Sequence, residues 1–146
     1  MKTIVITGAT SGIGLESAML LAKKGYRTVG VGRSGERCTK AREEILAENE
    51  GADVAFFTAD LMQQREVLRV ADEITEYINK SGGGELHALI NNAGCVRSWY
   101  MTTDEGYEQQ FALNYLSAFL LTHRLLPLLI KAGGRVILTG SGSHKH

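Results

Sequence analysis

Short apolar runs and longer amphipathic segments alternate along the whole chain. The short runs are rich in β-branched residues, a composition typical of strands buried on both faces. They cover residues 3–7, 27–31, 54–58, 86–90 and 135–139. The segments between them carry apolar residues at helical spacing, at residues 13–24, 36–50, 63–79 and about 104–131. This alternation predicts an α/β domain with a doubly wound parallel sheet, strand order 3-2-1-4-5, and helices on both faces.

Local signals set the expected ends of the helices. Gly25 and Gly51 follow the first two helical segments, where a glycine cap is common. Residues 102–105 read Thr-Thr-Asp-Glu, which fits a capping box and predicts that the last helix starts there and runs to about Lys131. Pro127 is expected to kink the last turns of that helix.

Composition and charge narrow the class of protein. The 146 residues suit a single domain, 1–146, and a formal net charge of +0 gives no reason to expect nucleic acid as a partner. Cys38 and Cys95 share no metal-ligand spacing with each other or with histidines, which predicts a reducing compartment and no metal. The longest apolar stretch, residues 116–130, contains His123, Arg124 and Pro127, so we expect no membrane span. With no signal peptide at the N-terminus, a cytoplasmic location is the default expectation.

A glycine-rich turn follows the first strand and opens the first helix. Gly8 permits a tight turn, Gly12 lets the backbone approach a pyrophosphate, and Gly14 lets the helix pack closely on the strand. The helix N-terminus offers N–H groups to phosphate, and the hydroxyls of Thr10 and Ser11 add donors. A glycine turn that binds nothing is the alternative, but this one lies between strand and helix, as nucleotide binding requires.

Five motifs in register resemble the short-chain dehydrogenase/reductase family over the whole chain. Residues 7–14 read Thr-Gly-x-x-x-Gly-Ile-Gly, and Asp60-Leu61 follows the third strand. Asn91-Asn92-Ala93-Gly94 follows the fourth strand, Asn114 lies in the last helix, and Ser141 follows the fifth strand. Residues 111–129 and 135–144 look most like the retinol-dehydrogenase-like group. The resemblance implies a Rossmann fold that lacks the family's last two strands, so the domain is incomplete at its C-terminus relative to the family.

The resemblance also implies roles for individual residues. Ser141 and Asn114 correspond to two of the four catalytic positions, the Ser holding the substrate oxygen and the Asn supporting a water chain. The implied cofactor-binding residues are Gly8, Thr10, Ser11, Gly12, Ile13, Gly14, Asp60, Leu61, Asn91, Ala93 and Gly94. Asp60 as a helix cap, Asn91 in a polar turn and Asn114 bonded to a neighbouring carbonyl are the structural alternatives. Trp99 and Tyr100 either line a substrate pocket or simply pack.

The end of the second strand bears on the choice of nucleotide. An enzyme that prefers NAD usually carries an acidic residue there, bonded to the ribose hydroxyls. Here Gly32 occupies that place and Arg33 follows, with Arg37 nearby. Arg33 is either an ordinary surface arginine or a planar fork that grips a 2′-phosphate. The missing acid and the present base favour NADP(H) over NAD(H).

The catalytic Tyr-x-x-x-Lys pair of the family is absent from these 146 residues. The five tyrosines, at positions 26, 77, 100, 107 and 115, are each followed four residues later by something other than lysine. We therefore expect no activity on a carbonyl or alcohol substrate from this chain alone. We also expect a homo-oligomer, because in the family the last helix forms much of a dimer interface.

Three hypotheses follow for the chain as it is printed. The first is the NADP(H)-binding piece of a longer oxidoreductase that transfers hydride between nicotinamide and a carbonyl or alcohol. The second is a catalytically inactive nucleotide-binding or interaction module. The third is one half of a split enzyme whose second half comes from another chain.

Overall fold

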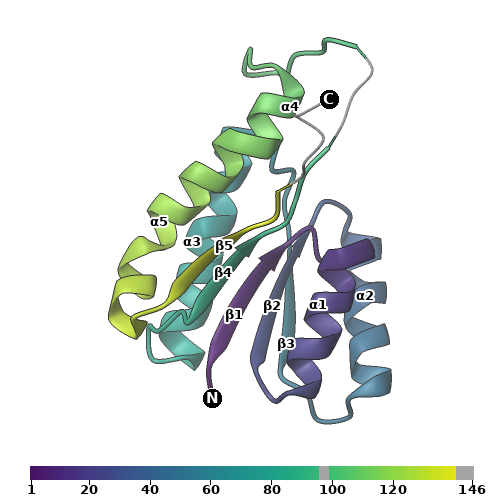
Figure 1. Cartoon of the computed structure of the whole chain (residues 1–146), viewed down its shortest axis with the longest axis vertical. Coiled ribbons are helices and arrows are strands. Elements are labelled where there is room, and N and C mark those ends of the chain that lie inside the picture. Colours follow the sequence, from purple (N-terminus) through teal and green to yellow (C-terminus); the bar gives the residue numbers. More distant parts are fainter. Residues whose placement is uncertain (96–98, 141–146) are drawn as a thin grey trace.

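The computed structural model describes residues 1–95 and 99–140. Its centre is a five-stranded parallel sheet with the order β3-β2-β1-β4-β5 (Figure 1). The strands are β1 (Thr3–Thr7), β2 (Arg27–Gly32), β3 (Val54–Thr58), β4 (Ala88–Asn91) and β5 (Arg135–Leu138). The predicted fold class and strand order are confirmed, and each predicted strand lies within two residues of the observed one.

Helices cover both faces of the sheet (Figure 1). On one side lie α1 (Gly12–Lys23) and α2 (Gly35–Glu48). On the other side lie α3 (Gln64–Ser81) and a long helix made of α4 (Gln109–Phe111), the π-helical η1 (Ala112–Leu116) and α5 (Ser117–Ala132). This layered arrangement is what the alternation of strand and helix patterns predicts.

Alternating side chains of β1 divide the core into two clusters. Val5 points to the layer of α3 and α5, where it joins Ile74 and Leu125. Ile4 and Ile6 point to the layer of α1 and α2. All five residues of β1 are buried. Because both faces of the central strand are covered, its carboxyl end can serve as a fixed platform for the loops that follow.

The expected capping box at residues 102–105 is wrong. The helix begins at Gln109, and the Glu108 carboxylate caps it by accepting hydrogen bonds from the N–H groups of Gln110 and Phe111, at 2.8 and 2.9 Å. Residues before it form a closed turn, in which Thr102 and Glu108 pair as an antiparallel bridge and Gly106 has a φ of 90°. That bridge holds the backbone out of helical geometry until Glu108.

Glu105 caps a different helix from the one predicted. Its carboxylate accepts hydrogen bonds from the backbone N–H groups of Gln64 and Arg65, the first two residues of α3. The N-cap residue of α3, Gln63, makes no side-chain cap of its own. The segment before the last helix is thereby fastened to the start of α3, about 40 residues earlier in the chain.

The long helix Gln109–Ala132 has 24 residues and, of the described helices, is the one long and apolar enough to cross a bilayer by length and composition. In the folded domain, however, Leu121, Leu125 and Leu129 are buried in the core cluster that α3 shares. Pro127 lies inside α5, which continues beyond it to Ala132. Its inner face therefore belongs to the core of the domain.

We predict that Glu105→Ala destabilises the fold by about 0.5–2 kcal/mol, the usual effect of losing an N-terminal cap. The neighbouring Asp104 makes only a 3.7 Å ion pair with Arg65 and its side chain is 80% exposed, so Asp104→Ala is the matched control. Urea unfolding followed by circular dichroism measures both variants. Equal stabilities for the two would contradict the assigned cap.

Candidate functional site

The glycine turn after β1 adopts backbone conformations that glycine favours. Gly8 and Gly12 have φ angles of 62° and 53°. A Cβ on Gly14 would lie 2.0 Å from the carbonyl oxygen of Gly8, so only glycine lets α1 approach the turn this closely. That is the packing role expected of Gly14 from the sequence.

The N-terminus of α1 is suited to an anion. Its N-cap residue, Ser11, makes no side-chain cap bond, and the first turn of α1 holds no acidic residue. A Cβ on Gly12 would meet nothing within 4 Å, so open space lies beside the backbone there. Backbone N–H groups and the positive end of the helix dipole can therefore face a phosphate group in that space.

The segment after β4 is bonded directly to the glycine turn. The N–H groups of Asn92 and Ala93 both donate to Thr7 Oγ1, each at 3.0 Å. The side-chain amide of Asn92 donates to the carbonyl oxygen of Gly8 at 3.3 Å. These bonds place the predicted Asn-Asn-Ala-Gly motif against the turn.

A cavity of about 280 Å³ opens between the turn and the ends of β2 and β3. It is lined by Gly8, Thr10, Ser11, Val31, Gly32, Arg33, Ala59, Asp60, Leu61, Met62, Asn92, Ala93, Gly94 and Leu113. Of the charged side chains in this lining, Arg33 is exposed, and Asp60 is half-buried with Oδ1 accepting from the Met62 N–H at 3.1 Å. We call this cavity the adenosine-side cavity.

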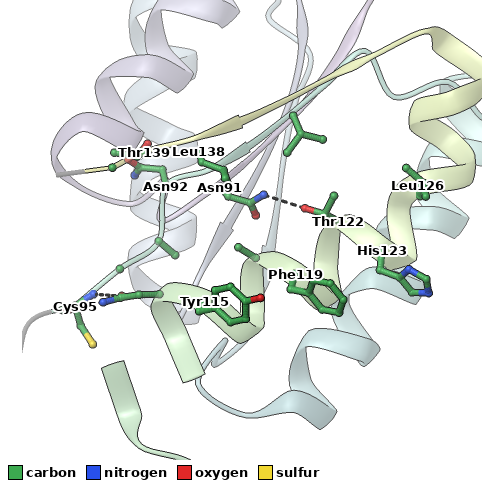
Figure 2. A pocket seen from close by; sticks show the side chains of 16 residues that line it. Asn91, Asn92, Cys95, Tyr115, Phe119, Thr122, His123, Leu126, Leu138 and Thr139 are labelled. Carbon is green, nitrogen blue, oxygen red and sulfur yellow. Dashed lines mark hydrogen bonds between the residues drawn. The ribbon is translucent and has the colours of Figure 1, made fainter. Parts of the chain in front are cut away.

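A larger, mainly apolar cavity of about 1050 Å³ runs along the long helix and β5 (Figure 2). Its lining is Asn91, Asn92, Ala93, Gly94, Cys95, Asn114, Tyr115, Ala118, Phe119, Thr122, His123, Leu126, Val136, Leu138, Thr139 and Gly140. We call it the helix-side cavity. The two cavities share Asn92, Ala93 and Gly94, so they meet at the end of β4. The larger volume reflects open apolar surface along α5, whereas the polar groups gather where the cavities meet.

Asn114 lies on the π-helical turn η1 and faces the segment after β4. Its Oδ1 accepts from the N–H of Cys95 at 2.8 Å, and its Nδ2 donates to the carbonyl of Cys95 at 2.9 Å. Figure 2 shows Cys95 and Tyr115 at the same end of the helix-side cavity. A π turn often marks a functional position in a helix, since it displaces one side chain from the regular spacing. Each amide atom of Asn114 keeps capacity for one further hydrogen bond.

The structure brings most of the predicted site residues together, though not all at a cavity wall. Gly12, Ile13 and Gly14 form the start of α1 beside the adenosine-side cavity and are not among its lining, and the Ile13 side chain is 70% exposed. Asn91 turns its side chain to the long helix, where Nδ2 donates to Thr122 Oγ1 at 3.1 Å. Ser141 lies outside the described residues.

Trp99 and Tyr100 neither line one of the two cavities nor pack inside the domain. Their side chains are 64% and 76% exposed, so they are not packed inside the domain. They are also absent from the lining of both cavities. Within the described part of the chain, no group of three or more His, Cys, Asp or Glu residues could hold a metal ion.

Sequence reasoning missed several residues of the site. Thr7 and Asn92 fasten the two loops together, and Thr139 lines the helix-side cavity at the end of β5. The signal for Thr7 and Asn92 was present, because both belong to motifs quoted from the sequence. Nothing in the local pattern singled out Thr122, which the fold brings to Asn91 from 31 residues away.

The model of the family described as short chain dehydrogenase matches residues 2–146. This chain therefore belongs to the short-chain dehydrogenase family. Retinol dehydrogenase 13 of Homo sapiens is 35% identical over 144 residues, which are 98% of this chain and 42% of that protein. The resemblance to retinol dehydrogenases that the sequence predicted is thus confirmed.

Solved structures give the same answer for the fold. A short-chain dehydrogenase from Sphingobium yanoikuyae in complex with NADPH matches with a TM-score of 0.80 and 30% identity, covering 97% of this chain and 54% of that one. A metagenomic short-chain oxidoreductase in complex with NADP matches with a TM-score of 0.81 and 26% identity, covering 99% and 64%. The chain thus spans less than half of this curated relative, and 54% and 64% of the two solved chains.

Proposed function

We propose that this chain is the NADP(H)-binding portion of a short-chain dehydrogenase that transfers hydride between nicotinamide and a carbonyl or alcohol substrate. The observation that carries the proposal is the meeting of two cavities at Asn92–Gly94, with the glycine turn on one side and Asn114 on the other. The complexes of similar proteins with NADPH and NADP support a nicotinamide cofactor.

The residues present fit a dinucleotide. The adenosine-side cavity offers room for one nucleoside and its phosphate beside the N-terminus of α1. Residues 92–94 would hold the middle of the dinucleotide, and Asn114 and Thr139, at the polar end of the helix-side cavity, would hold its second nucleoside. The chain's own residues would hold and orient the cofactor, whose nicotinamide would supply or accept the hydride when bound.

The end of β2 favours NADP(H) over NAD(H). A Cβ on Gly32 would lie 2.4 Å from Thr10 Cγ2 and 2.8 Å from Cys38 Sγ, so an acidic side chain has no room there without shifts of both neighbours. The exposed Arg33 lines the same cavity and can pair with a 2′-phosphate through its planar guanidinium. The end of β2 therefore carries no carboxylate that would repel a 2′-phosphate, and Arg33 supplies a cation beside it.

Arg33→Ala is expected to weaken NADPH binding by about 1.5–3 kcal/mol, the value of a hydrogen bond to a charged group, and to leave NADH binding nearly unchanged. Arg37→Ala is the control, since Arg37 lies on the first turn of α2 and outside the lining of the cavity. Fluorescence titrations with both nucleotides on the three proteins measure the effect. An equal loss for NADPH and NADH would show that Arg33 does not read the 2′-phosphate.

Proton transfer is the step for which these 146 residues lack the family's groups. Hydride delivery to a carbonyl leaves an alkoxide that needs a proton as it forms, and the five tyrosines have no lysine four residues on. Asn114 can orient a water or a backbone carbonyl, but an amide is no proton donor at neutral pH. The activity therefore belongs to the protein that also supplies the Tyr and Lys.

The 146-residue chain is predicted to show no NADPH oxidation with aldehydes, ketones or retinoids at an ordinary enzymatic rate. A positioned acid typically contributes about 10²–10⁴-fold in rate, and that factor is missing here. The comparison is a version extended at its C-terminus by a segment that carries a Tyr-x-x-x-Lys pair, and both are assayed by absorbance at the nicotinamide band. Turnover by the short version at the rate of the extended one would contradict this prediction.

The long helix is proposed to mediate self-association. Phe111, Tyr115 and Phe119 stack along its outer face, with neighbouring ring centroids 5.3 and 6.4 Å apart, and all three side chains are about half exposed. The outer strand β5 exposes Val136 and Leu138, which line the same cavity as Tyr115 and Phe119. An apolar surface of this extent on one side of a domain is typical of an interface.

Phe119→Glu is expected to shift the 146-residue chain from a dimer towards a monomer in sedimentation velocity runs. Leu20→Glu is the matched control, because Leu20 is 54% exposed on α1, in the opposite helix layer. A wild-type chain that sediments as a monomer at high concentration would contradict the proposal, as would equal effects of the two substitutions.

A further inference from the structure

Two charged side chains of α3, Glu66 and Arg69, bind the backbone on either side of the start of the loop that carries Asp60. Arg69, on the second turn of α3, donates from Nη2 to the carbonyl oxygen of Thr58 at 2.8 Å. The same guanidinium pairs with Glu66 through two bonds, Nε to Oε2 and Nη2 to Oε1, each 3.0 Å long. Arg69 therefore links α3 to the last residue of β3, directly before the loop.

Glu66 extends this contact to Asp60 itself. Its Oε1 accepts from the backbone N–H of Asp60 at 3.4 Å. The hydrogen bonds from Arg69 lower the pKa of the Glu66 carboxyl from its usual value, so Glu66 stays ionised and keeps its acceptor atoms. Arg69 thus binds the backbone of Thr58 and Glu66 binds the backbone of Asp60. The residue between these two, Ala59, is buried.

The Asp60 side chain is also held by the backbone of the residues that follow it. Its Oδ1 accepts from the Met62 N–H at 3.1 Å, which leaves Oδ2 as the acceptor for a ligand in the adenosine-side cavity. A carboxylate oxygen can accept from an amino group but repels a carbonyl oxygen. The orientation of this one oxygen therefore decides whether a base with an amino group or with an oxo group is preferred.

We propose that Glu66 and Arg69 are positioning residues that aim the Asp60 carboxylate at the exocyclic amino group of the adenine ring. This inference rests on the proposed function, because it takes the adenosine-side cavity to bind the adenine half of the cofactor. Glu66 and Arg69 touch the loop backbone and not the base, so they set selectivity between bases through geometry.

Stabilisation of α3 by exposed ion pairs does not explain why Glu66 and Arg69 also bind the backbone of the loop. Exposed ion pairs within a helix stabilise proteins little, and Arg69 already has such a partner in Glu73, at 2.5 Å from Nη1. The bonds to Thr58 and Asp60 do not stabilise the helix itself, because the Thr58 carbonyl and the Asp60 N–H both lie outside α3. Among the described residues, Glu73 binds the Arg69 guanidinium and makes no hydrogen bond to the loop, so it is a matched control for Glu66.

The test compares NADPH with its hypoxanthine analogue, in which an oxo group replaces the adenine amino group. Dissociation constants for both are measured on the 146-residue chain and on Asp60→Asn, Glu66→Ala, Arg69→Lys and Glu73→Ala, with the thermal midpoint of each protein. The wild type is expected to prefer NADPH on the order of tenfold or more, the value of a hydrogen bond to a charged group. Asp60→Asn, Glu66→Ala and Arg69→Lys are expected to lose most of that preference, and Glu73→Ala to keep it.

The outcomes separate the two proposals. A wild-type chain that binds neither nucleotide overturns the proposed function, and this inference with it. Binding with an unchanged preference in Glu66→Ala and Arg69→Lys overturns the positioning role alone. A loss of affinity by the same factor for both nucleotides, alongside a lower thermal midpoint, also overturns it, because the pair is then merely structural. Adding Glu66→Ala to Asp60→Asn is expected to cost no further preference, since both act through one carboxylate.

Discussion

The Thr7 hydroxyl oxygen accepts hydrogen bonds from two consecutive backbone N–H groups, those of Asn92 and Ala93, and so holds the end of β4 against the glycine turn. The parallel pairing of β1 with β4 brings the two chain segments to the same edge of the sheet. Gly8 makes the contact possible, because a Cβ there would lie 3.0 Å from the Cα of Ala93. A wider gap at this point would pull apart the two cavities that meet at residues 92–94.

The sequence was sufficient for features that depend on local pattern and burial. The strands were predictable because a parallel sheet covered on both faces demands apolar, β-branched runs, and β1 is buried along its whole length. The glycine turn was predictable because few backbones can approach as closely as Gly14 and Gly8 do. Arg33 and Asp60 were found at one cavity because the carboxyl ends of neighbouring parallel strands share an edge.

The errors arose where a side chain serves a distant element. The acidic residues at 104–105 read as a local cap, but Glu105 satisfies the N–H groups of α3, about 40 residues away, so the long helix starts later than predicted. Asn114 was expected from a motif, whereas its bonds to the Cys95 backbone depend on the π turn that carries it. Glu66 and Arg69 were not singled out from the sequence, because a sequence does not show that Thr58 and Asp60 lie beside them.

The long helix and the edge strand β5 differ in how their apolar residues are covered. Leu121, Leu125 and Leu129 on the inner face of the long helix are buried, while all four residues of β5 are exposed. A parallel strand rich in apolar residues is normally covered on both faces, so the surface of β5 and Phe119 favours contact with further protein. That surface is continuous with the polar end of the helix-side cavity at Asn114 and Thr139. Any protein segment that covers it also excludes water from the place where a nicotinamide is proposed to bind, which couples assembly to the electrostatics of hydride transfer.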